Sequence, residues 1–361
     1  MIRWWIRARR SVEKTLPDLL ALAGGTAPRF VYGGHVESIP VFTYHAVDSS
    51  FARDLEVLSR GGYRTAGADE LAANARGRAA SDGRTVALTF DDGDISLLHT
   101  AVPLLAKYGF RGIAFVVSGL VPPSTADGLA GWAELRAGVA SGVLEVGSHS
   151  LYHHQVPVSP KLVGFVDPST AAHFTANVPI PRGNGYEPAE VGTPIFRGRP
   201  RYTARAAFRP DPEAVERCRR FARERGGALF ARPGWVRELA RLAPRAGTYE
   251  TASEADAAVV ADIRQSLDRI ASECPNPAQR HLCYPWYART ARADALAAEA
   301  GVALLFGGIG VRDQGSHGKV PPLLRRLPPD LLLRLPGPGR RSLGALLRAR
   351  GQAIGVSLRG R

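Results

Sequence analysis

Short apolar runs alternate with segments of helical periodicity through the first half of the chain. The runs are rich in β-branched and aromatic residues, which predicts strands, and they lie at residues 39–47, 86–90, 112–117 and 143–146. The segments of helical periodicity lie at residues 52–60, 68–73, 95–108 and 132–141. Strands that alternate with helices are typical of parallel β/α units, and their repetition predicts a barrel or an open parallel sheet. In such folds the chemistry lies at the carboxyl ends of the strands.

The pattern changes between residues 157 and 244, where proline, glycine and arginine are frequent and one helix is clear, at residues 212–225. We interpret this segment as a long, loop-rich insertion near the rim of a pocket, because long loops in compact domains are usually functional. Beyond it, an amphipathic helix is expected at residues 255–274 and a strand at residues 280–284. Residues 301–311 predict a buried strand and turn.

The chain therefore divides into three expected parts. Residues 1–38 form a basic N-terminal extension, residues 39–330 form the main domain with its insertion, and residues 331–361 form a basic C-terminal tail. Leucine and arginine dominate the sequence from Leu323 onward, and a basic amphipathic helix is expected at residues 343–353.

Composition limits the class of protein and its partners. With 361 residues, of which 45% are hydrophobic and 22% charged, the chain can bury a large core and is globular. Its formal net charge of +14 favours contact with anionic surfaces such as phospholipid or acidic glycans. We expect no nucleic-acid partner, because no recognisable nucleic-acid module accompanies the charge. The three cysteines are too few for a disulfide framework, which favours a reducing compartment.

The N-terminus carries the positive charge of a secretory signal but lacks its apolar core, and no apolar run approaches the ~18 residues of a membrane-spanning helix. We therefore expect a cytoplasmic protein without a signal peptide or a transmembrane helix. Trp4, Trp5 and Ile6 lie among arginines, and both tryptophan and arginine favour the interface of an anionic membrane. Peripheral contact with the inner face of the membrane is expected on these grounds.

Two polar motifs follow predicted strands. The first is TFDDG at residues 89–93, in which Asp91 and Asp92 end the strand. An Asp-Gly pair after a strand is by itself typical of a turn. The second motif, GSHSLYH, places His149 and His153 four residues apart, a spacing that puts both imidazoles on one face of a helical turn. Two histidines and a carboxylate can hold one divalent ion and leave a position open for water.

With these motifs the chain resembles the polysaccharide deacetylases, the carbohydrate esterase group defined by homology to nodulation protein B. The family's first motif reads T-F-D-D-G and its second H-[ST]-x-x-H, and both are present. Residues 39–47 resemble its opening strand, P-V-x-x-Y-H-x-V, and residues 51–63 resemble its next helix and turn. Residues 283–287, CYPWY, stand where the third motif, R-x-P-[YF]-G, is expected. The resemblance covers residues 39–153 well and about 255–330 loosely.

The resemblance implies a distorted, seven-stranded (β/α) barrel and a metal-dependent mechanism. Asp92, His149 and His153 are implied as the metal ligands, and Asp91 as the base that takes a proton from water. We expect Zn²⁺ as the ion, although the mixed nitrogen and oxygen ligands also suit Co²⁺ or Ni²⁺. His154 is an alternative to His153 that the spacing disfavours.

The third motif departs from the family pattern. Trp286 follows the proline, and the resemblance implies that its backbone N–H holds the oxyanion. Cys283 replaces the arginine that orients the base in the family. Either another residue, for example Arg197 or Arg199 of the insertion, takes over this task, or the base is tuned differently. We interpret Cys283 as a small buried residue, with a nucleophile or a fourth metal ligand as the alternatives.

The general acid is expected to be a histidine. The family's final motif, L-x-x-H, is absent in that form. His45, at the end of the first strand, occupies a place where relatives with the same opening strand carry a histidine that faces the pocket, and it is preferred. His317, in a glycine-rich loop, is the second candidate.

The expected function is removal of N-acetyl groups from an amino sugar, or from a glycan or glycolipid that contains one. Hydrolysis of another non-peptide amide on the same fold, such as a formyl sugar or a small cyclic amide, is one alternative. A catalytically inactive binder of carbohydrate or anions is the other, and the missing arginine is its main argument. Metal content separates this binder from the enzymes.

Overall fold

The computed structural model describes residues 36, 38–126, 128–171, 190–244, 246–308 and 319–338. The expected N-terminal extension up to residue 35, His317 and the expected helix at residues 343–353 lie outside the described residues. The expectations for those segments stay predictions.

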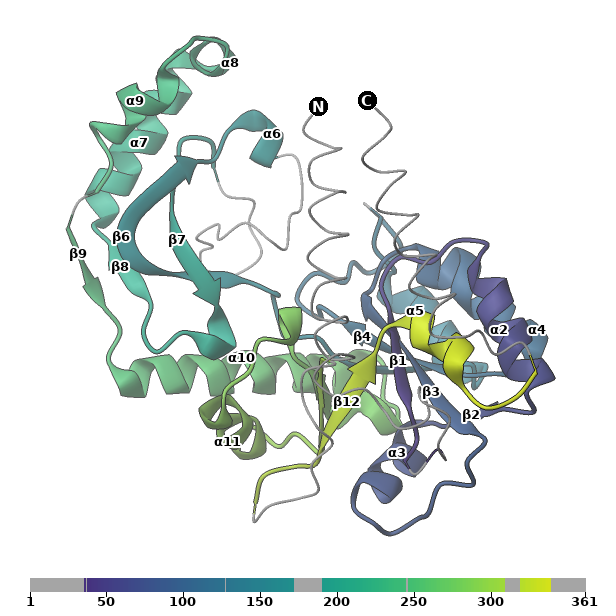
Figure 1. The fold of residues 1–361 in the computed structure, drawn as a ribbon. Helices are drawn as coiled ribbons and strands as arrows, with labels where there is room; N and C mark the ends of the chain where they lie inside the picture. The colour runs from purple at the N-terminus through teal and green to yellow at the C-terminus, as the bar shows by residue number, and fades with distance from the viewer. Residues whose placement is uncertain are drawn as a thin grey trace.

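Seven parallel strands form a closed barrel (Figure 1). Around the barrel they are β1 (Val41–Tyr44), β12 (Leu323–Leu327), β11 (Leu304–Gly307), β10 (His281–Cys283), β5 (Leu144–Ser148), β4 (Gly112–Val116) and β3 (Thr85–Asp92). Pairing of β1 with β3 closes the ring, and a short strand, β2 (Arg64–Thr65), pairs with the first two residues of β3. The barrel is distorted between β5 and β10, which share the single pair Leu282 and Ser148. The expected distorted seven-stranded barrel is confirmed.

Helices cover the outside of the barrel. They are α2 (Phe51–Arg60), α3 (Ala68–Ala75), α4 (Val102–Tyr108), α5 (Trp132–Ala140), α10 (Ala252–Glu273) and α11 (Ala291–Glu299), with one turn of wider helix, η2 (Leu97–Ala101), before α4. Each helix expected from periodicity within the described residues is present, and α11 was not predicted. The longest, α10, begins at a capping box in which Thr251 and Glu254 each bond to the other's backbone N–H. It buries Val259, Ile263 and Leu267.

The barrel interior is filled by alternate residues of its strands, because successive side chains of a strand point to opposite faces. One buried cluster contains Val41, Ala87, Phe115, Leu304 and Phe306 from four different strands. The rings of Phe115 and Phe306 lie 4.8 Å apart between centroids. The interior is therefore a packed core of mostly apolar side chains.

The insertion forms a lobe that projects from the barrel (Figure 1). Its elements are the antiparallel hairpin β6 (Gln155–Phe165) and β7 (Pro194–Pro200), the pair β8 (Phe208–Pro210) and β9 (Gly247–Tyr249), the 3₁₀ turn η3 (Arg201–Thr203), and the helices α6 (Pro168–Ala171), α7 (Pro212–Arg225), α8 (Gly227–Phe230) and α9 (Trp235–Ala240). The helix expected at residues 212–225 is confirmed. The expected insertion is present, and it also contains a hairpin that was not predicted, because prolines within β6 and β7 hid strands whose two-stranded sheet tolerates them at its edges.

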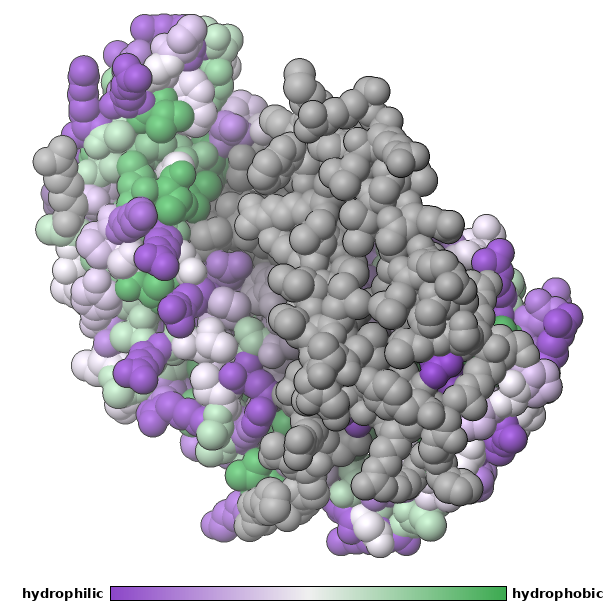
Figure 2. All heavy atoms as spheres, viewed as in Figure 1, coloured by the Kyte–Doolittle hydropathy of each residue, from purple (hydrophilic) through white to green (hydrophobic). Residues whose placement is uncertain are grey.

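The lobe has a small core of its own, which includes Phe165, Cys218 and Leu239. Its surface mixes apolar and charged residues, as the left side of Figure 2 shows, and Val163 and Val236 are 57% and 43% exposed. The described part of the lobe is therefore folded around its own core.

The packed domain continues past the expected boundary at residue 330. After β12, the 3₁₀ helix η6 (Pro329–Arg334) buries Leu331 and Leu332, and Leu335 follows in the same cluster. Among the described residues, no helix is both long and apolar enough to cross a membrane.

Candidate active site

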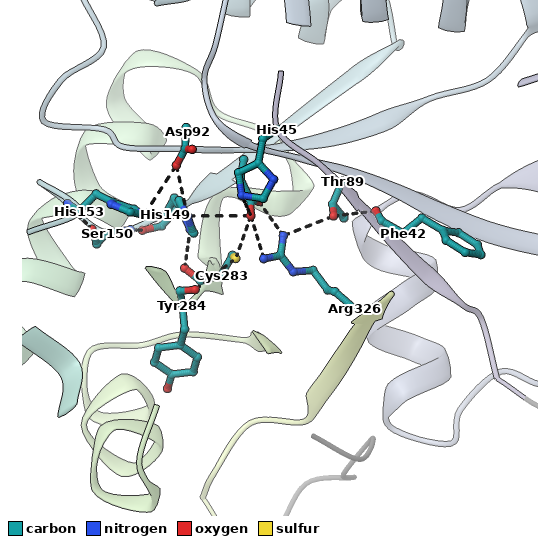
Figure 3. A network of polar contacts seen from close by, with 12 residues as sticks. Phe42, His45, Thr89, Asp92, His149, Ser150, His153, Cys283, Tyr284 and Arg326 are labelled. Carbon is teal, nitrogen blue, oxygen red and sulfur yellow. Dashed lines mark hydrogen bonds and ion pairs between the residues drawn. The ribbon is translucent and has the colours of Figure 1, made fainter. Parts of the chain in front are cut away.

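Polar side chains gather where the barrel strands end. Asp91 and Asp92 close β3, His45 follows β1 and His149 follows β5. Cys283 ends β10 and lies next to His149 (Figure 3). The parallel strands all end at this rim, so residues far apart in the sequence meet here.

One carboxylate and two imidazoles form a group that fits a divalent ion. The Asp92 Oδ1 atom lies 3.5 Å from Nε2 of His149 and 3.7 Å from Nε2 of His153, and all three ligand atoms lie within 4.8 Å of one another. Metal–ligand bonds of about 2.1 Å in tetrahedral geometry give ligand separations of about 3.4 Å. The three side chains are therefore spaced as the ligands of one ion would be, with both nitrogens directed at the carboxylate (Figure 3).

His149 is held in the form that binds a metal. Its Nδ1 lies 2.9 Å from the backbone oxygen of Cys283, so Nδ1 donates to that carbonyl and Nε2 is left with a lone pair. Burial of the ring is the largest cause that lowers the pKa of His149, to about 3. The imidazole is consequently neutral at ordinary pH, as metal coordination requires.

His153 reaches the site from an irregular turn. The expected helical turn was wrong, because Ser150 and His153 have φ angles of 73° and 46°. The His153 N–H donates to Ser150 Oγ at 2.7 Å, and its ring packs against Trp286 at 4.2 Å between centroids. The neighbouring His154 lines a cavity beside the turn and is outside the ligand group, in agreement with the preference for His153.

Asp91 is paired with Arg326, a residue that the sequence reasoning missed. Arg326 Nη1 and Nη2 donate to the two carboxylate oxygens at 2.6 and 2.8 Å, and both side chains are buried. Burial by itself raises the pKa of Asp91, but Arg326, followed by His149 and His45, holds that pKa well below its usual range. Asp91 is therefore ionised and fixed in orientation.

Arg326 takes the place expected for Arg197 or Arg199. That expectation was wrong, since both residues lie on β7 with exposed side chains. The missed signal is an arginine inside the apolar run LLRRL of β12, where alternation puts Arg326 on the same inward face as Leu324. A buried arginine needs a carboxylate partner, and Asp91 is that partner.

Cys283 is a buried thiol beside this pair. Its Sγ lies 4.0 Å from Asp91 Oδ2, and Asp91, His149 and Cys283 also have ligand atoms within 4.8 Å of one another. Burial is the main cause that raises the pKa of Cys283 well above its usual value. The protonated thiol agrees with the interpretation as a small buried residue and disfavours a nucleophile.

His45 stands at the open side of the site. Its Nε2 lies 3.7 Å from Asp91 Oδ2, and 40% of its side chain is exposed (Figure 3). It can therefore contact both the Asp91 carboxylate and a substrate that enters from solvent.

Backbone strain concentrates in the same loops. Within the described residues, five residues other than glycine have positive φ: Asp92, Ser150, His153, Trp286 and Tyr287. All five belong to the loops of the three motifs. Positive φ is costly for such side chains and persists only where the surrounding structure enforces it, which is common at functional sites.

Known proteins resemble this chain in part of its sequence and in fold. Residues 78–172 match the family model described as polysaccharide deacetylase, and no curated protein matches the sequence. A de-N-acetylase from Aggregatibacter actinomycetemcomitans is 16% identical, and the match covers 80% of this chain and 94% of that chain with a TM-score of 0.51. The deacetylase domain of BpsB from Bordetella bronchiseptica is 19% identical over 80% of this chain and 95% of that chain, with a TM-score of 0.49.

The match to the family model confirms the resemblance seen in the sequence. It indicates an enzyme of the class that hydrolyses carbon–nitrogen bonds other than peptide bonds. The likeness to the Aggregatibacter structure, at 16% identity, shows the shared fold.

Proposed function

Because residues 78–172 belong to the polysaccharide deacetylase family, we propose that this protein is a metal-dependent hydrolase that removes N-acetyl groups from an amino sugar. The observation that carries the proposal is the group formed by Asp92, His149 and His153, which lies directly beside the ionised Asp91. An acetamide is a poor electrophile, so its hydrolysis needs activated water, a polarised carbonyl and a proton for the departing amine.

Each of these needs has a candidate in the site. Asp92, His149 and His153 would hold the ion, which polarises the acetamide carbonyl and lowers the pKa of a bound water from ~15.7 toward 7. We assign Asp91 as the base that accepts the water's proton and His45 as the acid that protonates the amine.

Two further residues support this chemistry. Arg326 keeps Asp91 ionised and directs its carboxylate, and the backbone N–H of Trp286 is assigned to the oxyanion. Since Arg326 supplies the guanidinium that the third motif lacks, the main argument for a catalytically inactive binder no longer holds. The substrate that we propose is an amino sugar, free or within a glycan or glycolipid.

The first prediction concerns metal content and turnover. Protein purified without chelator is expected to contain one divalent ion per chain, Zn²⁺ in the first place and Co²⁺ or Ni²⁺ as substitutes, because the ligands are one oxygen and two nitrogens. Elemental analysis measures the ion, and release of acetate from a panel of N-acetylated sugars and lipid-linked precursors measures activity. Chelation should remove both, and Zn²⁺ should restore both. A protein that contains no metal and gains none on titration would refute the proposal.

We also propose that the protein contacts an anionic membrane peripherally, on the strength of its +14 charge and the tryptophans and arginines near residue 5. Co-sedimentation with vesicles of phosphatidylglycerol and phosphatidylcholine at low salt is expected, and binding should weaken as salt rises. Vesicles of phosphatidylcholine alone are the control. Absence of binding at low salt, or equal binding to both vesicles, would contradict this prediction.

A further inference from the structure

We propose that the insertion completes the metal site: Tyr202, on η3, and Asp262, on α10, position the turn that carries His153. The inference rests on the proposed function only in taking His153 as a metal ligand. It assigns a task to the insertion that neither its sequence nor its family match indicates.

The pair at the centre of this arrangement is buried and tightly bonded. The Tyr202 hydroxyl donates to Asp262 Oδ2 at 2.5 Å, and Tyr202 and Asp262 are 5% and 8% exposed. The backbone N–H of Leu151, inside the ligand turn, approaches the same Oδ2 atom at 3.4 Å. Burial and the Asp262 carboxylate raise the pKa of Tyr202 well above its usual range, so the phenol keeps its proton and remains a donor.

Ser150 connects this pair to the metal ligand. Its Oγ accepts the backbone N–H of His153 at 2.7 Å, and Ser150 lines the same small cavity as Tyr202 and Asp262. The turn is therefore held at two adjacent residues. The Leu151 N–H is directed at the Asp262 carboxylate that Tyr202 holds, and Ser150 holds the backbone of His153.

The turn needs this support because its backbone is strained. Ser150 and His153 have φ angles of 73° and 46°, which an unsupported turn would leave. Ser150 and His153 bound a strained segment of four residues, so movement of this segment would carry the His153 imidazole away from Asp92. A residue that fixes this turn therefore fixes the distance between two proposed metal ligands.

Tyr202 is itself anchored from the side of the lobe. The preceding residue, Arg201, is buried and pairs with Glu250 at 2.8 Å, and it also donates to the backbone oxygen of Ala255 at 2.8 Å. The Tyr202 ring meets Tyr284 edge-on at 5.7 Å between centroids. With its backbone and its ring both held, the Tyr202 hydroxyl is a fixed point against which the ligand turn is set.

The test is Tyr202→Phe in the full chain, with metal affinity as the readout. Removal of groups that hold metal ligands in place typically costs 10- to 100-fold in affinity, and we expect about 10-fold weaker Zn²⁺ binding. Competition with a chromophoric chelator measures the affinity, and the absorption spectrum of the Co²⁺-loaded protein reports ligand geometry independently of activity. Affinity within twofold of wild type, with an unchanged Co²⁺ spectrum, would overturn the inference.

Tyr284→Phe is the matched control. Tyr284 is also a buried tyrosine in the same aromatic cluster, and its hydroxyl donates to Asp294 at 2.8 Å, but Asp294 belongs to α11 rather than to the ligand turn. We expect a comparable loss of thermal stability in both variants and a loss of metal affinity in Tyr202→Phe only. Equal loss of affinity in both would show that general destabilisation is the cause and would overturn the proposal.

Ser150→Gly supplies a second route to the same test. Glycine removes the hydroxyl yet tolerates the φ of 73°, so the variant is expected to fold. Because Tyr202 and Ser150 hold the same turn, their effects should not add, and the double variant should bind Zn²⁺ no more weakly than the weaker single variant. Additive losses would mean that the two residues act independently and would overturn the inference. Failure of the wild-type protein to bind metal would refute the proposed function instead, so the two failures are distinguishable.

Discussion

His149→Ala is expected to lose both the bound metal and all measurable turnover, whereas Asp91→Asn is expected to lose turnover and keep the metal. The ligand atom of His149 lies within 4.8 Å of those of Asp92 and His153, and its removal leaves two ligands, too few to hold the ion tightly. Asp91 is paired with Arg326 instead, and loss of a general base costs ~10²- to 10⁴-fold in rate.

Elemental analysis after gel filtration and acetate release on the same preparations measure both effects. His154→Ala is the matched control, because His154 is an adjacent imidazole outside the ligand group, and it should keep the metal. Equal loss of metal in Asp91→Asn and His149→Ala would show that Asp91 is a ligand. Loss of metal in His154→Ala with retention in His153→Ala would show that the two histidines are assigned in reverse.

Arg326→Met is expected to destabilise the metal-free fold by about 3–5 kcal/mol and to remove turnover. Arg326 and Asp91 are 1% and 2% exposed, so the substitution leaves a carboxylate buried without its partner. The methionine side chain fills much of the same space, which separates the loss of charge from the loss of volume. Urea unfolding in the presence of chelator measures stability without a contribution from the metal.

The pH dependence of this effect follows from the sign of the Asp91 shift. In the wild type the pKa of Asp91 lies below its unfolded value, so its contribution to stability is present above the unfolded pKa and is lost as pH falls through the folded pKa. In Arg326→Met, burial acts without the guanidinium and raises that pKa, so the carboxyl can be protonated in the folded state. The difference in stability between variant and wild type is therefore expected to be largest near pH 7 and smaller near pH 4.

Two further variants test whether the unpaired Asp91 carboxylate causes the loss of stability in Arg326→Met. Arg325→Met, at the half-buried neighbouring position on β12, should have a much smaller effect on stability. Adding Asp91→Asn to Arg326→Met should recover part of the stability, because it removes the charge left without a partner, but it should not recover turnover. A double variant that is as unstable as the sum of the two single variants would contradict this explanation.

The sequence by itself determined most strands and helices of the barrel, although not β12 or α11, and it identified the candidate metal ligands. Apolar runs that are buried on both sides, such as residues 112–117, are recognisable without knowing their neighbours, because burial alone sets their composition. Asp91, Asp92, His149 and His153 were found because each follows such a run, and the ends of parallel strands meet at one rim. The family match over residues 78–172 lies in this same part of the chain.

Only the tertiary structure decided which distant side chains complete the site. Arg326 contacts Asp91 across a separation of 235 residues, and Tyr202 contacts Asp262 across 60. Neither pairing leaves a local pattern, since an arginine in a leucine-rich segment is equally compatible with a solvated tail. The turn at Ser150 was mistaken for helix for the same reason, because spacing sets a helical face only if the backbone is helical. Closure of the barrel brings β12 beside β1, and Tyr202 of the lobe lies beside the turn that carries His153. Each buried polar group then needs a partner, and the order of residues along the chain does not specify which one.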